Sequence, residues 1–173
     1  MRVLLDERGV RAALYHIADE ITAAANNGVP IALIGVRSRG DILARRLAEE
    51  LKRRSLPPLA LGTLDITLYR DDLAEIGPSA VVRTTDIPFD VAGRYIFLID
   101  DVIYTGRSVR AALDAIMDLG RPKAIRLVVL VDRGGRELPI QPDVVGVQTD
   151  ETREHVRVLL KETDGADRVE ICS

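Results

Sequence analysis

The sequence predicts an α/β fold, in which helices flank a parallel sheet and an antiparallel hairpin lies at the C-terminal end. Continuous apolar runs of strand length, such as IALIGV at 31–36 and IRLVVLV at 125–131, alternate with amphipathic helical segments. This alternation is typical of right-handed crossover units whose sheet is covered on both faces. The segment HVRVLLKETDGADRVEI at 155–171 instead alternates around Asp164-Gly165, as antiparallel strands joined by a turn do.

The first half of the chain is expected to form a helix, a strand and a second helix. Between Val10 and Asn26 the apolar residues recur with helical spacing, and Gly28 and Pro30 end this helix. The apolar run at 31–36 has the length of a buried strand. The next helix is expected at 41–54, where one stripe carries Ile42, Leu43, Leu47 and Leu51.

The second half is expected to add further strands and one more helix. The segment LDITLY at 64–69 alternates apolar and polar residues, and YIFLI at 95–99 is entirely apolar, so both are predicted strands. A helix follows at 109–120, where apolar residues share one face and Gly120 ends the pattern. The run at 125–131 is the next buried strand.

Composition is typical of a single globular domain, expected to cover 1–173. The 173 residues are 47% hydrophobic and 29% charged, which suffices for one core. No apolar run approaches the ~20 residues that span a bilayer, and the start MRVLLDERGV has no signal-peptide pattern, so a cytoplasmic protein without membrane contact is expected. The lone Cys172 excludes an internal disulfide. Because the net charge is −3, any RNA surface must be a local basic patch.

Three predicted strands run directly into polar loops that contain glycine. These loops are GVRSRG, DDVIYTGRS and VDRGGRE. In open α/β sheets, ligands bind outside the carboxyl ends of the strands. We therefore expect all three loops to line one cleft.

The middle loop combines two acids with the start of a helix. Asp100 and Asp101 lie where the strand at 95–99 is expected to end, and the residues at 105–108 lie where the next helix begins. Free backbone N–H groups at a helix start bind phosphate, although the loop lacks the Walker-type pattern of nucleoside triphosphatases. Two carboxylates beside such a cradle suit the hydroxyls of a phosphorylated sugar, directly or through Mg²⁺. The dipeptide alone is equally compatible with a plain strand end and helix cap.

The complete segment FLIDDVIYTGRSV at 97–109 closely resembles the phosphoribosyl-pyrophosphate signature of type I phosphoribosyltransferases. The segments at 35–51, 61–73 and 118–140 are similar to the bacterial pyrimidine-operon regulators that are also uracil phosphoribosyltransferases, and the resemblance covers nearly the whole chain. It implies a type I phosphoribosyltransferase fold. It also implies synthesis of UMP and pyrophosphate from uracil and phosphoribosyl pyrophosphate, and binding of pyrimidine-operon mRNA in response to uridine nucleotides.

The resemblance also implies roles for single residues. The 5′-phosphate would be held by Thr105, Gly106, Arg107 and Ser108. Asp100 and Asp101 would hold the ribose hydroxyls and, through these or through water, Mg²⁺. Pyrophosphate would bind at Arg37, Ser38 and Arg39, whose alternative is an exposed basic turn.

Catalysis would involve Asp100 and Asp101 together with Arg70, a clamp on pyrophosphate. Arg70 begins a mobile loop at about 70–88 in the family pattern, whose alternative is a plain connecting loop. Tyr104 stands where purine-using relatives carry an acid, which favours a pyrimidine. The base edge would meet the loop that contains Asp132 and Arg133.

Several departures from the family pattern concern RNA. Gly135, Gln141 and Val147 stand where the family usually has histidine, arginine and lysine. The remaining expected RNA contacts are His16 and Arg136, whereas His155 is expected to have an ordinary surface or packing role. Because RNA affinity rests on cationic phosphate contacts, these departures should weaken it.

Two functions of different classes therefore remain open. One is a uracil phosphoribosyltransferase that retains weakened RNA-dependent regulation, and the other is a UMP-sensing RNA-binding regulator with little catalysis. A transferase for another base is a minor alternative. The resemblance further implies a homodimer or higher homo-oligomer.

Overall fold

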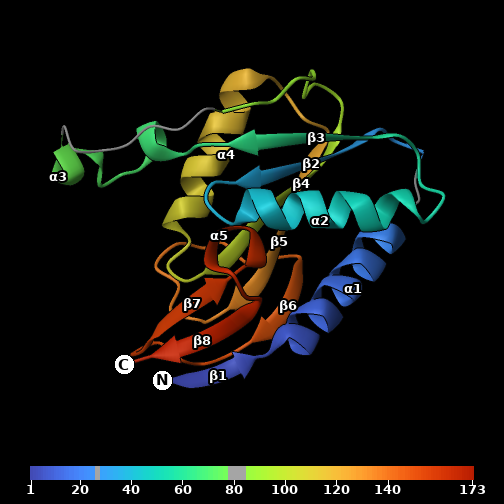
Figure 1. Ribbon diagram of the computed structural model, residues 1–173. Coiled ribbons are helices and arrows are strands. Elements are labelled where there is room, and N and C mark those ends of the chain that lie inside the picture. The colour runs from blue at the N-terminus through green and yellow to red at the C-terminus, as the bar shows by residue number, and fades with distance from the viewer. Residues whose placement is uncertain (26–27, 78–84) are drawn as a thin grey trace.

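A five-stranded parallel sheet in the order β3-β2-β4-β5-β6 forms the centre of the protein (Figure 1). The computed structural model describes residues 1–25, 28–77 and 85–173. All neighbouring strands of this sheet run parallel, which confirms the predicted fold class. The strands are β2 (Ile31–Val36), β3 (Leu59–Leu64), β4 (Tyr95–Ile103), β5 (Ala124–Asp132) and β6 (Val144–Gln148).

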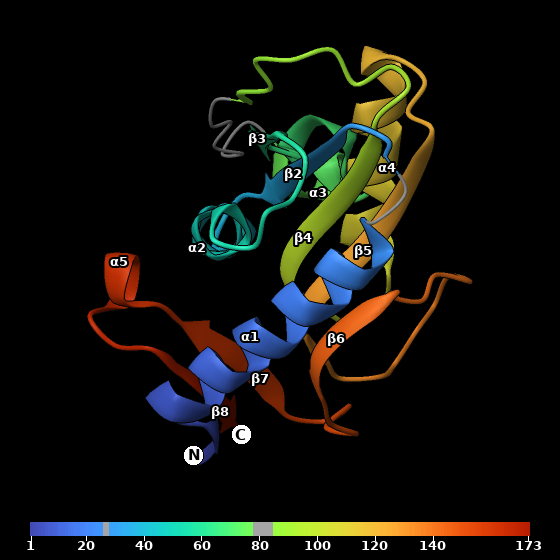
Figure 2. The same ribbon diagram turned by 90° about the vertical axis from the view of Figure 1, so that its right-hand side faces the viewer.

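Helices cover both faces of this sheet. Helices α1 (Glu7–Ala24) and α2 (Gly40–Lys52) pack on one face together with Leu33 and Phe97. Helix α4 (Arg107–Leu119) packs on the other face with Ile34 and Leu98. Figure 2 shows α4 on the side of the sheet opposite α2. Strands buried on both faces need apolar side chains at every position, which explains why the sequence shows continuous runs rather than alternation.

A second, antiparallel sheet in the order β1-β8-β7 contains the predicted C-terminal hairpin. Its strands are β1 (Arg2–Leu5), β7 (His155–Leu159) and β8 (Arg168–Cys172), with the short helix α5 (Lys161–Asp164) between β7 and β8. The hairpin turns at Gly165, whose φ of 78° lies in the left-handed region that glycine favours. Because β1 pairs with β8, the two chain ends lie close together (Figure 1).

The predicted strand at 64–69 was wrong. Strand β3 ends at Leu64, and Thr67–Tyr69 forms the 3-10 turn η1. The side chain of Asp65 explains the end of the strand, since its Oδ1 accepts hydrogen bonds from both the backbone N–H and the hydroxyl of Thr67. The true strand, Leu59–Leu64, pairs residue by residue with β2.

The predicted mobile loop at about 70–88 lies partly outside the described residues, which omit 78–84. Its first part contains α3 (Leu73–Ile76), and near its end Asp86 exchanges backbone hydrogen bonds of 2.7 and 2.8 Å with Thr63. Its mobility stays a prediction. Over the described ranges, no helix is both long and apolar enough to cross a membrane.

Candidate active site

The two adjacent acids lie where β4 extends beyond β2. The expected strand end at Ile99 was wrong: β4 continues to Ile103 and stays paired with β5, whereas the pairing of β2 with β4 ends at Gly35 and Ile99. Beyond Ile99 the loop after β2, rather than β2 itself, lies against β4. Asp100 is buried there, whereas Asp101 lines two adjoining pockets.

Burial makes this acid pair difficult to ionise. Asp100 is 7% exposed, and burial together with the neighbouring Asp101 carboxylate raises its pKa well above the ordinary value. Burial also raises the pKa of Asp101. Each carboxylate accepts one backbone N–H, from Asp101 at 2.9 Å and from Val102 at 2.8 Å. Hydroxyl donors or a cation would stabilise the ionised pair, as a ribose and a metal ion would.

The predicted phosphate cradle lies at the first turn of α4. Gly106 caps this helix with a φ of 92°, and the Thr105 hydroxyl accepts the Arg107 N–H at 3.3 Å. The following free N–H groups carry the positive end of the helix dipole. The Arg107 side chain turns aside, because it donates to Glu137 at 3.0 Å and to Asp71 at 2.6 Å. The Arg107 side chain is therefore engaged elsewhere, and its predicted role in the cradle would fall to its backbone N–H.

The loop after β2 folds tightly against β4. A Cβ atom at Gly40 would lie 2.5 Å from the carbonyl oxygen of Ile99, and one at Gly35 would lie 2.4 Å from the carbonyl oxygen of Gly40. Two glycines therefore let this loop approach the acids. Between them, the Arg37–Ser38 peptide bond is cis.

The two arginines of this loop have different partners. The Arg39 guanidinium donates to Asp164, the last residue of α5, with distances of 2.9 and 3.3 Å. Arg37 donates to the Thr63 hydroxyl at 3.4 Å and lies 3.8 Å from the Asp41 carboxylate. The loop thus brings two cations to the edge of the acid pair.

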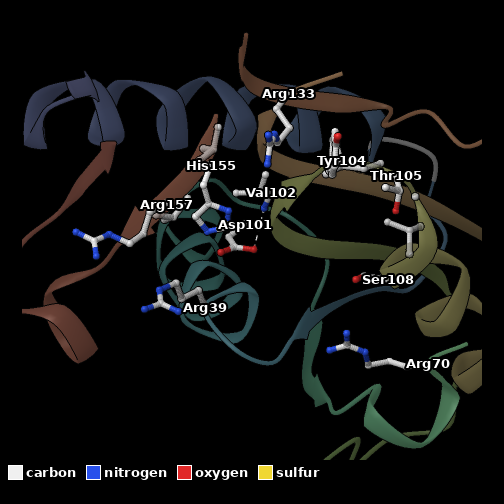
Figure 3. A pocket seen from close by; sticks show the side chains of 15 residues that line it. Arg39, Arg70, Asp101, Val102, Tyr104, Thr105, Ser108, Arg133, His155 and Arg157 are labelled. Atoms are coloured by element: carbon white, nitrogen blue, oxygen red, sulfur yellow. Dashed lines mark hydrogen bonds between the residues drawn. The ribbon is translucent and has the colours of Figure 1, made fainter. Parts of the chain in front are cut away.

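The three predicted loops do line one cleft. Two adjoining pockets of about 750 and 280 Å³ form it. Arg70 reaches it from the segment after η1, with its guanidinium 2.7 and 2.8 Å from the Asp72 carboxylate oxygens. Figure 3 shows that Arg39 and Arg70 approach from different elements. The residues common to both pockets are Arg39, Arg70, Asp101, Val102 and Ser108.

The loop after β5 contributes Arg133 to another wall of this cleft. Arg133 is 7% exposed and donates to the carbonyl oxygens of Glu151 and Glu154. Its guanidinium lies 4.2 Å from the ring centre of Tyr104, whose hydroxyl donates to the Thr152 carbonyl at 3.3 Å. These contacts tie the segment before β7 to the strand that carries the acids.

The side chain of Asp132 is engaged within its own loop. Its carboxylate accepts hydrogen bonds from the Gly134 N–H at 3.0 Å and from Arg136 at 2.8 Å. Although burial favours the neutral acid, the hydrogen bond from the Arg136 guanidinium holds the pKa of Asp132 below its usual value. A direct contact of Asp132 with the base stays a prediction.

Comparison with known proteins decides the family. The phosphoribosyl transferase domain model matches residues 4–163. A bifunctional protein PyrR of Pelotomaculum thermopropionicum is 53% identical over 169 residues, which cover 97% of this chain and 93% of the relative. The chain belongs to the PyrR family of phosphoribosyltransferases. This confirms the predicted membership among pyrimidine-operon regulators with uracil phosphoribosyltransferase activity.

Other relatives agree with this assignment. A bifunctional protein PyrR of Thermus aquaticus is 52% identical over 97% of this chain and 93% of its own length. Among solved structures, a hypoxanthine phosphoribosyltransferase from Trypanosoma cruzi has a TM-score of 0.78 at 19% identity and covers 99% of this chain and 94% of its own. One from Staphylococcus aureus has a TM-score of 0.74 at 15% identity, covering 99% and 92%. These two structures support the fold alone.

The two expected RNA contacts of this chain lie in different settings. His16 is exposed on α1. Arg136 uses its guanidinium within the protein, donating to the carbonyl oxygens of Ile140 at 2.8 Å and Tyr104 at 3.1 Å as well as to Asp132. Arg136 therefore braces the loop, and a role in RNA binding stays a prediction for both residues.

Sequence reasoning missed one wall of the cleft. His155 and Arg157 project from β7 and line the larger pocket (Figure 3), whereas His155 had been expected to have only a surface or packing role. Arg157 is held by the buried Glu170 at 2.8 Å. The alternation of β7 indicated which side chains share a face, but no local signal indicated that this face meets the cleft.

Proposed function

We propose that the protein transfers the phosphoribosyl group of phosphoribosyl pyrophosphate to uracil, giving UMP and pyrophosphate. The observation that carries this proposal is the convergence of three recognition elements on one cleft: a helix-start cradle, a buried acid pair and cationic side chains from two separate loops. These elements match the 5′-phosphate, the ribose hydroxyls and the pyrophosphate of one substrate.

The reaction breaks the bond between C1′ and the pyrophosphate oxygen and forms a bond from C1′ to N1 of uracil, which loses its proton. Positive charge develops on the ribose and negative charge on the departing pyrophosphate. Arg37, Arg39 and Arg70 would stabilise the leaving group, and the Asp100 and Asp101 carboxylates would orient the sugar. Arg70 must exchange Asp72 for pyrophosphate, which couples the segment after η1 to substrate binding.

Asp100 and Asp101 fit an indirect role in binding Mg²⁺. Their carboxylates supply hard oxygens, but among the described residues no group of three or more His, Cys, Asp or Glu side chains could hold a metal ion alone. We therefore assign most ligands of the ion to the substrate, with the acids acting through ribose hydroxyls or water. When bound, the ion would neutralise charge on the pyrophosphate.

A second function, RNA-dependent regulation of pyrimidine genes, is favoured by the relatives named bifunctional protein PyrR. The expected partner is mRNA of the pyrimidine operon, with UMP as the sensed nucleotide and a homodimer or higher homo-oligomer as the binding form. Gly135, Gln141 and Val147 lack the charges usual in the family, and Arg136 is engaged internally. These features support weakened RNA binding beside catalysis.

The deciding experiment measures pyrophosphate release from phosphoribosyl pyrophosphate with uracil, hypoxanthine, guanine and orotate in parallel, with and without Mg²⁺. We expect pyrophosphate release with uracil but not with the other bases. This release should require Mg²⁺ and should be lost in Asp100→Asn. If another base gives release in place of uracil, that base is the substrate. Binding of UMP without release with any base would instead support the regulator that senses UMP with little catalysis.

A further inference from the structure

The proposed function leaves one wall of the cleft without an assigned ligand. The cradle at α4, the acid pair of β4 and the arginines at 37, 39 and 70 account for phosphate, ribose and pyrophosphate. The remaining polar lining is formed by Tyr104 and Arg133 on one side and by His155 and Arg157 of β7 on the other. The base is the one part of the substrates that still needs a wall.

His155 has a side chain suited to that wall. It is exposed, it lines the larger pocket, and Figure 3 shows it pointing from β7 into the cleft, toward the side where Asp101 and Val102 lie. Within the described part of the chain, no hydrogen bond or ion pair involves its imidazole. Arg157 differs, because its guanidinium is already paired with the buried Glu170.

The backbone that carries His155 is held firmly. Arg133 donates to the carbonyl oxygen of Glu154, the residue bonded directly to His155, and to that of Glu151. Tyr104 donates to the carbonyl oxygen of Thr152 in the same segment. On its other side, His155 is in register with Cys172 of β8. These contacts fix the backbone that carries His155 and therefore limit the part of the cleft that its imidazole can reach.

We propose that His155 reads the edge of the base, a specificity-determining contact that rests on the proposed transfer to uracil. A neutral imidazole offers one donor and one acceptor. The edge of uracil presents an N3–H donor between two carbonyl acceptors, so the imidazole can donate to a carbonyl or accept from N3–H. Arg133 and Tyr104 act as positioning residues for this contact.

The test uses the imidazole signals of the whole protein in nuclear magnetic resonance. The chain has two histidines, so His155→Gln assigns every ring signal, and His16 on α1 is an internal control. Saturating UMP should shift the His155 signals and leave those of His16 in place. Ribose 5-phosphate and pyrophosphate, which lack the base, should leave both unchanged.

Two results would overturn the assignment: His155 signals that stay unmoved while calorimetry shows UMP bound, and His155 signals that ribose 5-phosphate or pyrophosphate shifts as much as UMP does. Failure of the proposed function looks different. It would appear in the wild-type protein as absent UMP synthesis and absent UMP binding, and it would remove both proposals together.

Steady-state kinetics give a second readout. His155→Ala should raise the KM for uracil by about tenfold, the effect of one lost hydrogen bond, and change the KM for phosphoribosyl pyrophosphate by less than about twofold. His155→Gln keeps a donor and an acceptor and should recover part of the uracil KM. Arg153→Ala, at an exposed position in the same segment, is the matched control. Equal changes in both KM values would indicate a general disturbance of β7 and contradict base reading.

Discussion

The ring of Tyr104 occupies the space that a side chain at Gly135 would need. A Cβ atom at Gly135 would lie 2.1 Å from Cε2 of Tyr104, far inside contact distance, and the φ of Gly135 is 76°. The glycine, which stands where the family usually has histidine, therefore lets Tyr104 lie against the loop after β5. In that position the tyrosine ring stacks on Arg133 and its hydroxyl reaches Thr152.

Gly135→Ala should destabilise the protein by more than Gly134→Ala. Gly134 has a similar φ of 69°, but a Cβ atom there would meet only Thr152, at an ordinary 3.8 Å. We expect about 1–2 kcal/mol for the backbone strain at either position, and about 1–3 kcal/mol more at 135 for the overlap with Tyr104. Urea unfolding measures both variants.

The extra cost at Gly135 should disappear when the ring is removed. In a Tyr104→Ala background, Gly135→Ala should cost about as much as Gly134→Ala, because only backbone strain remains. An unchanged cost in that background would show that the overlap is relieved by movement of the loop rather than carried by the tyrosine ring.

Asp100→Asn should lower the rate of UMP synthesis by about 10²-fold or more. It should also stabilise the free protein at neutral pH. Activity falls because the substituted amide cannot provide the negative charge that orients the sugar. Stability rises because burial and the Asp101 carboxylate raise the pKa of Asp100, so its ionisation opposes folding. The amide oxygen can still accept the Asp101 N–H.

The stability difference should depend on pH in one direction. Below the ordinary carboxyl pKa, near 4, Asp100 is protonated in both folded and unfolded chains, and the variant has no advantage. Above that value the unfolded chain releases its proton more readily than the folded chain, so wild-type stability falls relative to Asp100→Asn. Urea unfolding between pH 4 and 8 tests this, with the less buried Asp101→Asn as the matched variant. A variant less stable than the wild type at pH 7 would contradict the prediction.

Arg39→Lys should raise the KM for phosphoribosyl pyrophosphate by about tenfold, since an ammonium cannot reproduce the forked geometry of a guanidinium. Asp164→Asn tests the ion pair separately. It removes the partner of Arg39 but keeps the guanidinium, so it should lower the melting temperature and change this KM by less than about threefold. If both variants change only stability, Arg39 serves the fold rather than the substrate.

Arg136→Ala should cost about 2–3 kcal/mol of stability, because its guanidinium donates to Ile140, Tyr104 and Asp132 at once. The exposed Arg153→Ala is the control and should change stability by less than about 0.5 kcal/mol. The stability of Arg136→Ala should therefore be measured by chemical denaturation before its affinity for pyrimidine-operon RNA is measured by filter binding. If the variant loses RNA affinity but keeps full stability, Arg136 contacts the RNA directly.

Periodicity predicted most of the large sheet but missed its edges. Strands β2, β4 and β5 are buried on both faces, so their apolar runs identify them without knowledge of their partners. Strand β6 at one edge of this sheet, like β1 of the smaller sheet, is short and only partly buried, and no strand was expected at either position. The segment 64–69 alternated like a strand, but the hydrogen bonds of Asp65 turned it into a 3-10 turn.

The sequence alone was sufficient for features that depend on neighbouring residues: the helix start at Thr105–Ser108, the adjacent acids and the three loops after strands. Contacts between distant segments emerged only in the folded chain. Arg39 meets Asp164 across 125 residues, the Tyr104 ring lies over Gly135, and His155 enters the cleft from a separate sheet. Periodicity specifies which face a side chain occupies along its own element, whereas the packing of elements against one another decides what that face meets.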